Sequence, residues 1–249
     1  MSRTATPADV IAGTARWCVV CGDGTKSIRA LPTGSLNAIV SDPPYGVDLA
    51  GTDWDAEIPS QACLAQNLRV SKGSVVWFGA SLPRVLLQFG RYKPIPDRTL
   101  IWSPAMSFSK SAANGVMYRW HPIWVWRMTD VQRGILPLDM LRHSTDAGAS
   151  GGKGTKQGYS HPARKPLGLM RDLVAAFVPL GGVVGDFFAG TGTTGVAAIL
   201  EGRRAILAEI DPQHAEEARR RCEEAEAGIT LAMPKQPPLL PLDAMVFPR

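Results

Sequence analysis

Three glycines in the last quarter of the chain form a loop that is suited to binding a ligand. Gly190, Gly192 and Gly195 in DFFAGTGTTG have the spacing G-x-G-x-x-G. Between a strand and a helix, such a turn lets a ligand approach the backbone N–H groups at the helix N-terminus. Nineteen residues after Gly190, Glu209 ends the next expected strand, where an acidic side chain accepts hydrogen bonds from ribose hydroxyls. The loop therefore predicts a cofactor that contains a nucleoside, although the glycine spacing alone does not identify it.

A second set of residues suited to chemistry is Asp-Pro-Pro-Tyr at 42–45, which follows the apolar run LNAIV. The amine of a nucleobase is a poor nucleophile, because its lone pair conjugates with the ring. A carboxylate and a backbone carbonyl that accept its two N–H bonds favour a pyramidal nitrogen, and prolines fix such a loop without adding N–H donors. The ring of Tyr45 offers a face on which an extruded base stacks. The set predicts a site for a base amine; the alternative is a proline turn that only closes a strand.

These loops need an α/β sheet to position them. Apolar runs predict strands at 16–21, 36–40, 73–79, 98–102, 122–127, 182–187 and 204–210, and helices are expected over 82–89, 166–177, 193–200 and 212–227. The pattern predicts a doubly wound, mostly parallel sheet of seven strands with helices on both faces. The neighbouring late strands 98–102 and 122–127 are candidates for antiparallel pairing. In the last helix, Glu216–Arg220 and Glu217–Arg221 have the i,i+4 spacing of pairs on an exposed face.

Basic charge is concentrated in the middle of the chain. Residues 84–171 hold 14 Lys and Arg against four acids, although the net charge of the whole chain is only +5. This distribution predicts a face that binds a polyanion, with a solvated basic surface as the alternative.

The cysteines and the apolar runs favour a reducing, cytoplasmic location. Cys18, Cys21, Cys63 and Cys222 form no disulfide framework for a chain of this length. Cys18 and Cys21 make a C-x-x-C without a second pair, so no metal site is expected. No apolar run reaches membrane-spanning length and the N-terminus lacks a secretory apolar region, so no membrane partner is expected.

Three motifs together resemble the DNA amino-methyltransferases that use S-adenosylmethionine. They are SDPPYG at 41–46, HPARKP at 161–166 and DFFAGTGTTG at 186–195. Their order resembles the circularly permuted beta group of that family, in which the catalytic motif precedes the cofactor motif. The resemblance implies a Rossmann-like methyltransferase fold and accounts for a glycine loop so late in the chain. The family often has proline where Phe187 stands, and Thr-Gln at positions 163–164, where this chain has Ala-Arg.

The resemblance implies a role for each matching residue. Asp42, Pro43 and Tyr45 would hold and activate the target amine, while Pro44 would shape the loop. Cofactor binding is implied for Asp23, His161, Lys165, Asp186, Phe188, Gly190, Gly192, Thr193, Glu209 and Ile210. Within this set, Glu209 would take the ribose hydroxyls, Ile210 would pack on the adenine ring and Asp23 would lie near the adenine amine. The others would surround or border the methionine part.

The implied reaction is direct transfer of the methyl group to the N6 amine of a flipped adenine in duplex DNA, which leaves S-adenosylhomocysteine. The family associates Asp-Pro-Pro-Tyr chiefly with adenine and a serine at the position of Asp42 with N4-cytosine, which is the first alternative. An RNA or protein-amide methyltransferase and a DNA-binding module without catalysis are further alternatives. An NAD-dependent oxidoreductase is disfavoured, because only one strand, one helix and a proline-rich tail follow the glycine loop.

The division of the chain follows from the motifs. Residues 1–127 are expected to form the catalytic half of the domain, 128–160 a target-recognition insertion, 161–230 the cofactor half and 231–249 a proline-rich tail. Candidate DNA contacts are Lys110, Arg119, Arg133, Arg142, His143, Lys153 and Lys156. Because one short insertion offers little groove contact, we expect a homodimer on double-stranded DNA. The sequence leaves open whether a cognate restriction enzyme exists.

Overall fold

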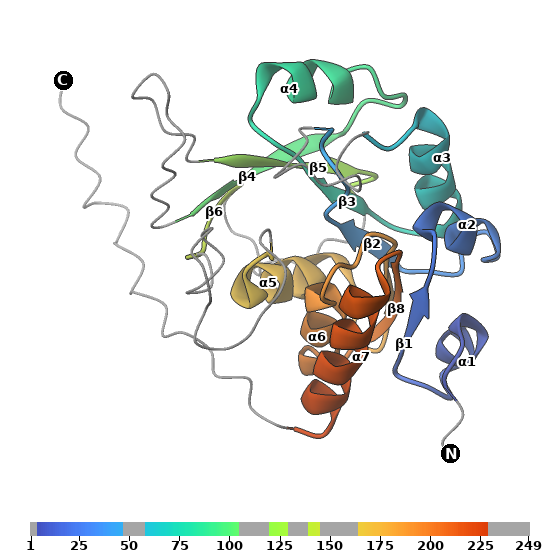
Figure 1. The fold of residues 1–249 in the computed structure, drawn as a ribbon. Coiled ribbons are helices and arrows are strands. Elements are labelled where there is room, and N and C mark those ends of the chain that lie inside the picture. The colour runs from blue at the N-terminus through green and yellow to red at the C-terminus, as the bar shows by residue number, and fades with distance from the viewer. Residues whose placement is uncertain (1–3, 47–57, 105–119, 129–138, 145–163, 229–249) are drawn as a thin grey trace.

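The protein folds as an α/β sheet with helices on both faces (Figure 1). The structure is a computed structural model that describes residues 4–46, 58–104, 120–128, 139–144 and 164–228. The strands are β1 (Trp17–Cys21), β2 (Ala38–Ser41), β3 (Val75–Phe78), β4 (Arg98–Ser103), β5 (His121–Trp126), β6 (Met140–Arg142), β7 (Val183–Asp186) and β8 (Arg204–Glu209). The helices are α1 (Pro7–Ala12), α2 (Gly24–Arg29), α3 (Gln61–Val70), α4 (Pro83–Phe89), α5 (Leu167–Phe177), α6 (Thr193–Leu200) and α7 (Pro212–Glu226).

The described strands form one sheet in the order β1-β8-β7-β2-β3-β5-β4-β6. β5 runs antiparallel to its neighbours β3 and β4, and all other neighbours in the sheet are parallel. The mostly parallel sheet and the antiparallel pairing of the two late strands are therefore confirmed. The sheet has eight strands rather than the predicted seven. The additional strand is β6, an edge strand of three residues that is too short to show periodicity in the sequence. It lies within 128–160, the segment predicted as a recognition insertion.

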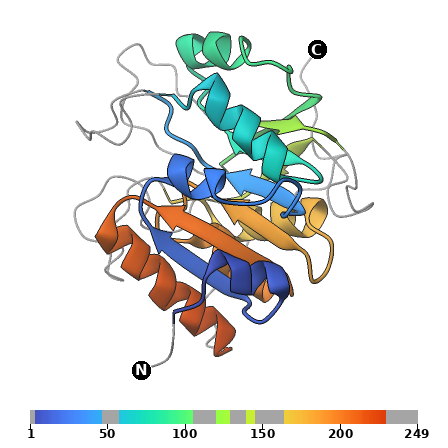
Figure 2. The ribbon, with the colours of Figure 1, turned by 90° about the vertical axis from the view of Figure 1, so that its right-hand side faces the viewer.

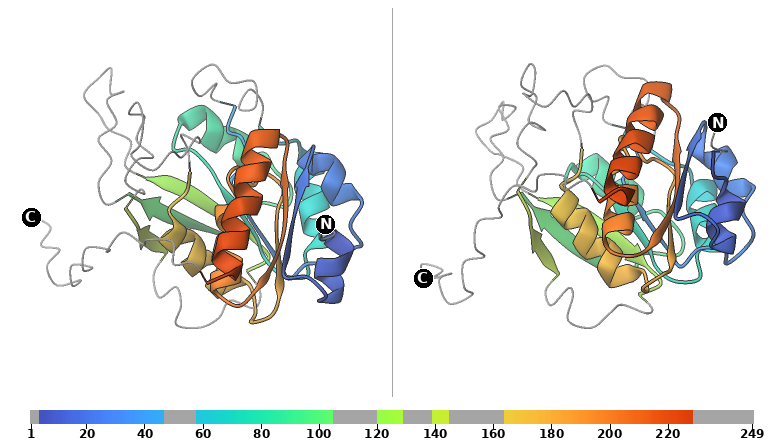
Figure 3. Two further views of the ribbon diagram at one scale, coloured as in Figure 1. Left: turned by 60° about the horizontal axis from the view of Figure 1, so that its bottom comes forward. Right: turned by 90° about the horizontal axis from the view of Figure 1, so that it is seen from below.

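Side chains of the central strands alternate between two apolar cores. In β3, Val76 and Phe78 pack in a core with α5, α6 and α7, whereas Val75 and Trp77 pack in a core with the four N-terminal helices. Successive side chains of a strand point to opposite faces, so both sets must be apolar when both faces are covered. Figure 3 shows α7 and α1 on opposite sides of the sheet.

The helices divide into those that the sequence predicted and those that it did not. α4, α5, α6 and α7 lie where helices were expected, within one residue at each end. α1, α2 and α3 were not predicted. Each begins with a side-chain cap, from Thr6, Asp23 and Ser60 respectively, but α1 and α2 have only six residues each. Such short segments carry little helical periodicity. No helix in the described part of the chain is long and apolar enough to cross a membrane.

The loops that carry the predicted site follow the carboxyl ends of neighbouring strands, at one edge of the sheet. β1, β8, β7 and β2 are consecutive parallel neighbours, so their carboxyl ends lie at the same edge. Figure 2 shows the arrowheads of β1 and β8 pointing the same way. In an open α/β sheet, this edge is where ligands bind.

Candidate active site

The Asp-Pro-Pro-Tyr loop and the glycine loop lie side by side. β2 ends at Ser41 and β7 ends at Asp186, and the two strands are hydrogen-bonded neighbours. The Ser41 hydroxyl donates a hydrogen bond of 2.6 Å to Oδ1 of Asp186. The motif predicted to hold the target amine and the motif predicted to hold the cofactor therefore meet in space, although they are far apart in the sequence.

Asp42 has a partner on each carboxylate oxygen. The Tyr45 hydroxyl donates to Oδ1 and the Lys165 ammonium donates to Oδ2. Lys165 is only 8% exposed, and its Nζ lies 5.7 Å from the centre of the Tyr45 ring and 5.2 Å from that of Phe78. A buried ammonium needs a counter-charge. Asp42 supplies it, so Lys165 contacts the motif that is predicted to hold the target amine, whereas the resemblance implied a position at the methionine end of the cofactor.

Asp186 is buried, with a relative exposure of 2%. Besides Ser41, the Phe188 N–H donates to Oδ1 at 3.1 Å and the Thr194 hydroxyl donates to Oδ2 at 2.6 Å. Burial raises the pKa of Asp186 to about 6, the three hydrogen bonds oppose that shift, and the charge of Asp42 adds to it. The carboxylate is therefore surrounded by protein groups. Its described hydrogen bonds come from Ser41, just before the Asp-Pro-Pro-Tyr loop, and from Phe188 and Thr194 around the glycine loop.

The glycine loop has a backbone that favours glycine. Gly190 and Gly192 have φ values of 51° and 76°, in the left-handed region. A Cβ on Gly192 would lie 2.7 Å from the Cβ of Ala218 on α7, so a side chain does not fit there. Gly192 is the N-cap of α6 and provides no side-chain cap, so Thr193 begins a helix whose first N–H groups lack that partner. Such a terminus attracts an anionic group.

The carboxyl ends of the neighbouring strands β1 and β8 carry three residues that are predicted to bind the cofactor, namely Glu209, Ile210 and Asp23. Glu209 accepts the N–H of Gly190 at 2.7 Å and that of Asp211 at 2.9 Å, one on each oxygen. Ile210 follows it and is 63% exposed. Cys21 at the end of β1 pairs in register with Glu209, which brings Asp23 to the same edge.

Asp23 is also the N-cap of α2. Its Oδ1 accepts the N–H groups of Thr25 and Lys26 at 2.7 and 3.4 Å, and Oδ2 has no partner within the described ranges. A Cβ on Gly24 would lie 1.9 Å from the carbonyl oxygen of Phe187, so α2 begins directly against the loop after β7. Phe187, where the family often has proline, is buried in the core with α1 to α4.

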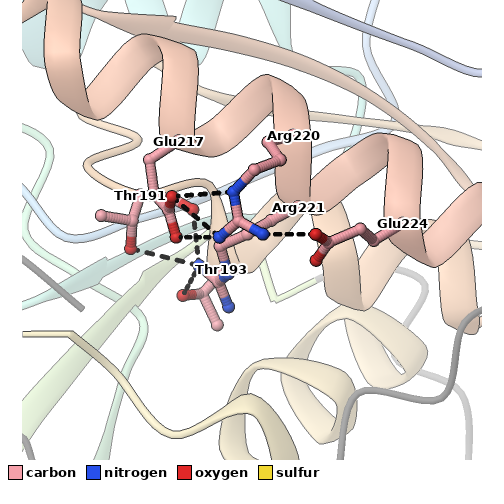
Figure 4. Close-up of polar contacts among 6 residues, drawn as sticks. All are labelled: Thr191, Thr193, Glu217, Arg220, Arg221 and Glu224. Atoms are coloured by element: carbon pink, nitrogen blue, oxygen red, sulfur yellow. Dashed lines mark hydrogen bonds and ion pairs between the residues drawn. The ribbon is translucent and has the colours of Figure 1, made fainter. Parts of the chain in front are cut away.

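Arg221 is a structural residue of the site that the sequence did not reveal. It is 4% exposed and donates hydrogen bonds to the carbonyl and hydroxyl of Thr191 and to the hydroxyl of Thr193 (Figure 4). The sequence predicted an i,i+4 pair with Glu217, of the kind that is typical of an exposed face. In the structure, the Arg221 side chain is instead buried against the glycine loop.

The predicted ion pairs on the exposed face of α7 need a correction. The i,i+4 rule assigned Arg220 to Glu216 and Arg221 to Glu217. Arg220 instead contacts Glu217 and Glu224, as Figure 4 shows, and Glu216 pairs with Arg219. Both i,i+3 and i,i+4 neighbours are within reach on a helix, and several acids compete for each arginine.

His121, at the start of β5, lies near Lys165 and Asp42 and was not predicted as a site residue from the sequence. Its ring stacks on Trp102 with the ring centres 4.8 Å apart. Burial, and then the charge of Lys165, lowers the pKa of His121 to about 4, so the ring is neutral near pH 7. Its Nδ1 is buried and has no hydrogen-bond partner among the described residues. A single histidine on an apolar strand gives no sequence signal for such a position.

Of the residues predicted to contact DNA, the structure describes Arg142 and His143. Arg142 is exposed at the end of β6. His143 is buried, with its Nε2 2.8 Å from a carboxylate oxygen of Asp172 on α5, and its carbonyl accepts the indole N–H of Trp102. His143 therefore holds the sheet edge to α5, and we withdraw it as a DNA contact. His161, Lys110, Arg119, Arg133, Lys153 and Lys156 lie outside the described residues.

The fold and the two joined loops define the class of protein, a DNA methyltransferase, and comparison with known families agrees. The model of the N6/N4 DNA methylase family matches residues 90–220, just over half of the chain. The chain belongs to this family.

Individual relatives are distant. The chain is 25% identical to the DNA adenine methyltransferase YhdJ of Escherichia coli (strain K12), over 83% of each protein. Among solved structures, it is similar to the PvuII DNA methyltransferase (cytosine-N4-specific), with a TM-score of 0.62 and 18% identity over 86% of this chain and 91% of that one. It is also similar to the M1.HpyAVI–SAM complex, with a TM-score of 0.60 and 17% identity over 82% of this chain and 99% of that one. At these identities the two structures establish a shared fold.

Proposed function

We propose that the protein transfers the methyl group of S-adenosylmethionine to the N6 amine of an adenine that is flipped out of double-stranded DNA. The observation that carries the proposal is the joining of the Asp42 loop to the glycine loop at one sheet edge. A base amine held by the first loop would face a methyl donor held by the second. Membership of the DNA methylase family supports this assignment.

S-adenosylmethionine fits the residues beyond β1, β7 and β8. The N-terminus of α6, which has no side-chain cap, suits its carboxylate. Glu209 already accepts two backbone N–H groups, but a carboxylate oxygen has two lone pairs, so it can also accept ribose hydroxyls. Exposed Ile210 offers an apolar surface for adenine, and Oδ2 of Asp23 would accept an N–H of the adenine amine.

The bound cofactor supplies an electrophilic methyl group, and the protein supplies alignment. Asp42 and the Pro43 carbonyl would accept the two N–H bonds of the target amine, which draws its lone pair out of conjugation. The Lys165 ammonium donates to Oδ2 of Asp42, which fixes the orientation of the carboxylate toward the amine. After transfer, the nitrogen has one proton too many, and Asp42 or water takes it. Alignment of this kind contributes up to about 7–11 kcal/mol in favourable cases.

Tyr45 can hold Asp42 and offer a ring face to the base at the same time. Its hydroxyl donates to Asp42 in this structure, and this hydrogen bond does not occupy the faces of the ring on which a base would stack. The remaining lone pairs on Asp42 allow the amine to bind beside Lys165 and Tyr45, and Pro44 limits the movement of the loop.

The choice of adenine rests on Asp42 as the first residue of the motif and on the name of the E. coli relative. The PvuII enzyme, which is cytosine-N4-specific, has the same fold, so N4-cytosine is the second candidate. Both bases present a conjugated amine of the same geometry, and the loop alone does not discriminate between them.

The proposal extends to how the DNA is bound. The basic middle of the chain, including exposed Arg142, would contact the phosphates, and two copies would share recognition of the site. Size-exclusion chromatography with light scattering, with and without DNA, tests the homodimer, and a strict monomer in both conditions contradicts it. A cytoplasmic setting, the domain boundaries and the permuted order of the motifs remain predictions from the sequence.

The test is transfer of label from tritiated S-adenosylmethionine to unmethylated duplex DNA. We expect incorporation by the wild type and none by Asp42→Ala, with cofactor affinity within about threefold by calorimetry, because the carboxylate is assigned to the amine. Asp97→Ala removes an exposed acid just before β4, at the opposite end of the strands from Asp42; it is the matched control and should retain activity. Cofactor binding without any transfer to DNA by the wild type would contradict the proposal.

A further inference from the structure

One buried carboxylate joins the two halves of the site. Oδ1 of Asp186 accepts hydrogen bonds from the Ser41 hydroxyl at 2.6 Å and from the Phe188 N–H at 3.1 Å, and Oδ2 accepts the Thr194 hydroxyl at 2.6 Å. Ser41 directly precedes the catalytic Asp42. Phe188 and Thr194 lie on either side of the glycine turn.

We propose that Asp186 is a positioning residue that couples cofactor binding at the glycine loop to the alignment of Asp42. The inference rests on the proposed function, because it takes the glycine loop as the cofactor site. Asp186 would act through the loops, without touching the cofactor or the base. The resemblance implied contact with the methionine part of the cofactor, and a side chain that is 2% exposed is poorly placed for that contact.

The burial of Asp186 is the reason why its hydrogen bonds can couple the Asp42 loop to the glycine loop. An ionised carboxyl group away from water depends on its hydrogen-bond donors, and the loss of one donor leaves an acceptor unsatisfied. Ser41 and Thr194 are themselves buried, so water does not readily replace either hydroxyl. A shift of the glycine loop therefore changes the hydrogen bonds of Asp186 that hold Ser41. In the same way, a shift of Ser41 changes the hydrogen bonds that hold the glycine loop.

The charged groups near Asp186 are Asp42 and its partner Lys165. The charged group that faces it is Asp42, whose like charge disfavours ionisation of Asp186, and Lys165 neutralises Asp42. Within the described residues, the other elements packed against Asp186 present uncharged groups. These are the hydroxyls of Ser41 and Thr194, the backbone of the glycine loop and, from β8, the apolar Leu207 in register with Asp186.

Titration of Asp186 gives the coupling a readout. With its pKa raised to about 6 by burial, the carboxyl gains a proton in an accessible pH range. A protonated oxygen must donate, which reverses one of the hydroxyl hydrogen bonds and disturbs the link. We therefore expect turnover at saturating cofactor to fall as the pH drops through about 6, and this feature should be absent in Asp186→Asn.

Hydroxyl deletions test the coupling across the bridge. We expect Ser41→Ala, on the catalytic side, to raise the dissociation constant of S-adenosylmethionine by about tenfold, the change expected for one hydrogen bond to a charged group. Thr194→Ala, on the cofactor side, should lower kcat at saturating cofactor by a similar factor. Thr194→Ser, which keeps the hydroxyl, should restore most of that loss.

Ser74→Ala is the matched control. Ser74 is also fully buried on the sheet, and its hydroxyl donates to the carbonyl of Arg127 at 2.7 Å, away from the two loops. It should lose stability but keep cofactor affinity and kcat. A dissociation constant for Ser41→Ala no higher than that for Ser74→Ala overturns the coupling, as does a limb near pH 6 that persists in Asp186→Asn. A wild type that binds S-adenosylmethionine but transfers nothing overturns the proposed function instead, and the comparison of dissociation constants still decides the coupling.

Discussion

Replacing Asp186 by asparagine is predicted to change how the free energy of unfolding depends on pH. Burial raises the pKa of Asp186 from 3.8 to about 6. Between these values the folded state binds a proton that the unfolded state releases, so this group lowers the free energy of unfolding as the pH rises. A shift of about two units corresponds to about 3 kcal/mol. Above about pH 6 the ionised carboxyl therefore destabilises the folded protein by this amount.

His121 makes the opposite contribution. Burial lowers the pKa of His121 from 6.5 to about 4. As the pH falls through this window the unfolded state binds a proton first, so about 3 kcal/mol of stability present above pH 6.5 is lost toward pH 4. In the wild type the two contributions oppose each other over most of the window and largely cancel, so the wild-type curve alone conceals both.

The assay is urea unfolding of the wild type, Asp186→Asn and His121→Gln at about pH 7.5 and about pH 4.5. Asp186→Asn is predicted to be more stable than the wild type by up to about 3 kcal/mol at the higher pH and to lose most of that advantage at the lower pH. His121→Gln should show the reverse dependence. A difference between Asp186→Asn and the wild type that does not vary with pH would refute the reasoning, because it would mean that the carboxyl does not titrate in this range.

Three further substitutions test the roles assigned to single residues. Lys165→Met removes the counter-charge of Asp42, the proposed catalytic carboxylate, so kcat should fall at least about 100-fold. Calorimetry should show the S-adenosylmethionine dissociation constant changed by less than about fivefold, and an equal loss of affinity would assign Lys165 to the cofactor. Gly192→Ala combines a φ of 76° with a contact of 2.7 Å, so thermal unfolding should show a loss of at least about 2 kcal/mol, against about 1 kcal/mol for Gly228→Ala. Gly228 has a φ of 72° and open space around its Cβ position, and equal losses would contradict the steric argument. Arg221→Leu should cost about 3 kcal/mol of stability and weaken cofactor binding, whereas the exposed Arg220→Leu should cost less than about 0.5 kcal/mol; similar losses would contradict the burial argument.

The frame of the fold was predictable because its signals are local. The apolar strands of a sheet covered on both faces read as continuous runs, as VVWF of β3 does. The proline at the start of α7 marked its beginning. α1 and α2 escaped prediction because two helical turns carry too few residues for periodicity, and β6 escaped for the same reason.

The contacts inside the site were not predictable, because they join residues that are distant in the sequence. The motif around Lys165 gave its type and position, but only the fold brings its ammonium onto Asp42. Ser41 and Thr194 are ordinary residues in sequence, and they matter because both face one buried carboxylate. Arg221 lies in a run of charged residues typical of a solvent-exposed face, and its burial follows from the packing of α7 against α6.

The most direct test of the account is the chemical identity of the methylated nucleoside. Unmethylated duplex DNA incubated with the protein and trideuteromethyl S-adenosylmethionine would be digested to nucleosides and analysed by mass spectrometry. The account predicts trideuterated N6-methyldeoxyadenosine with the wild type and none with Asp42→Ala. Trideuterated N4-methyldeoxycytidine would keep the mechanism and change the base, whereas the absence of label from every nucleoside would contradict the central claim.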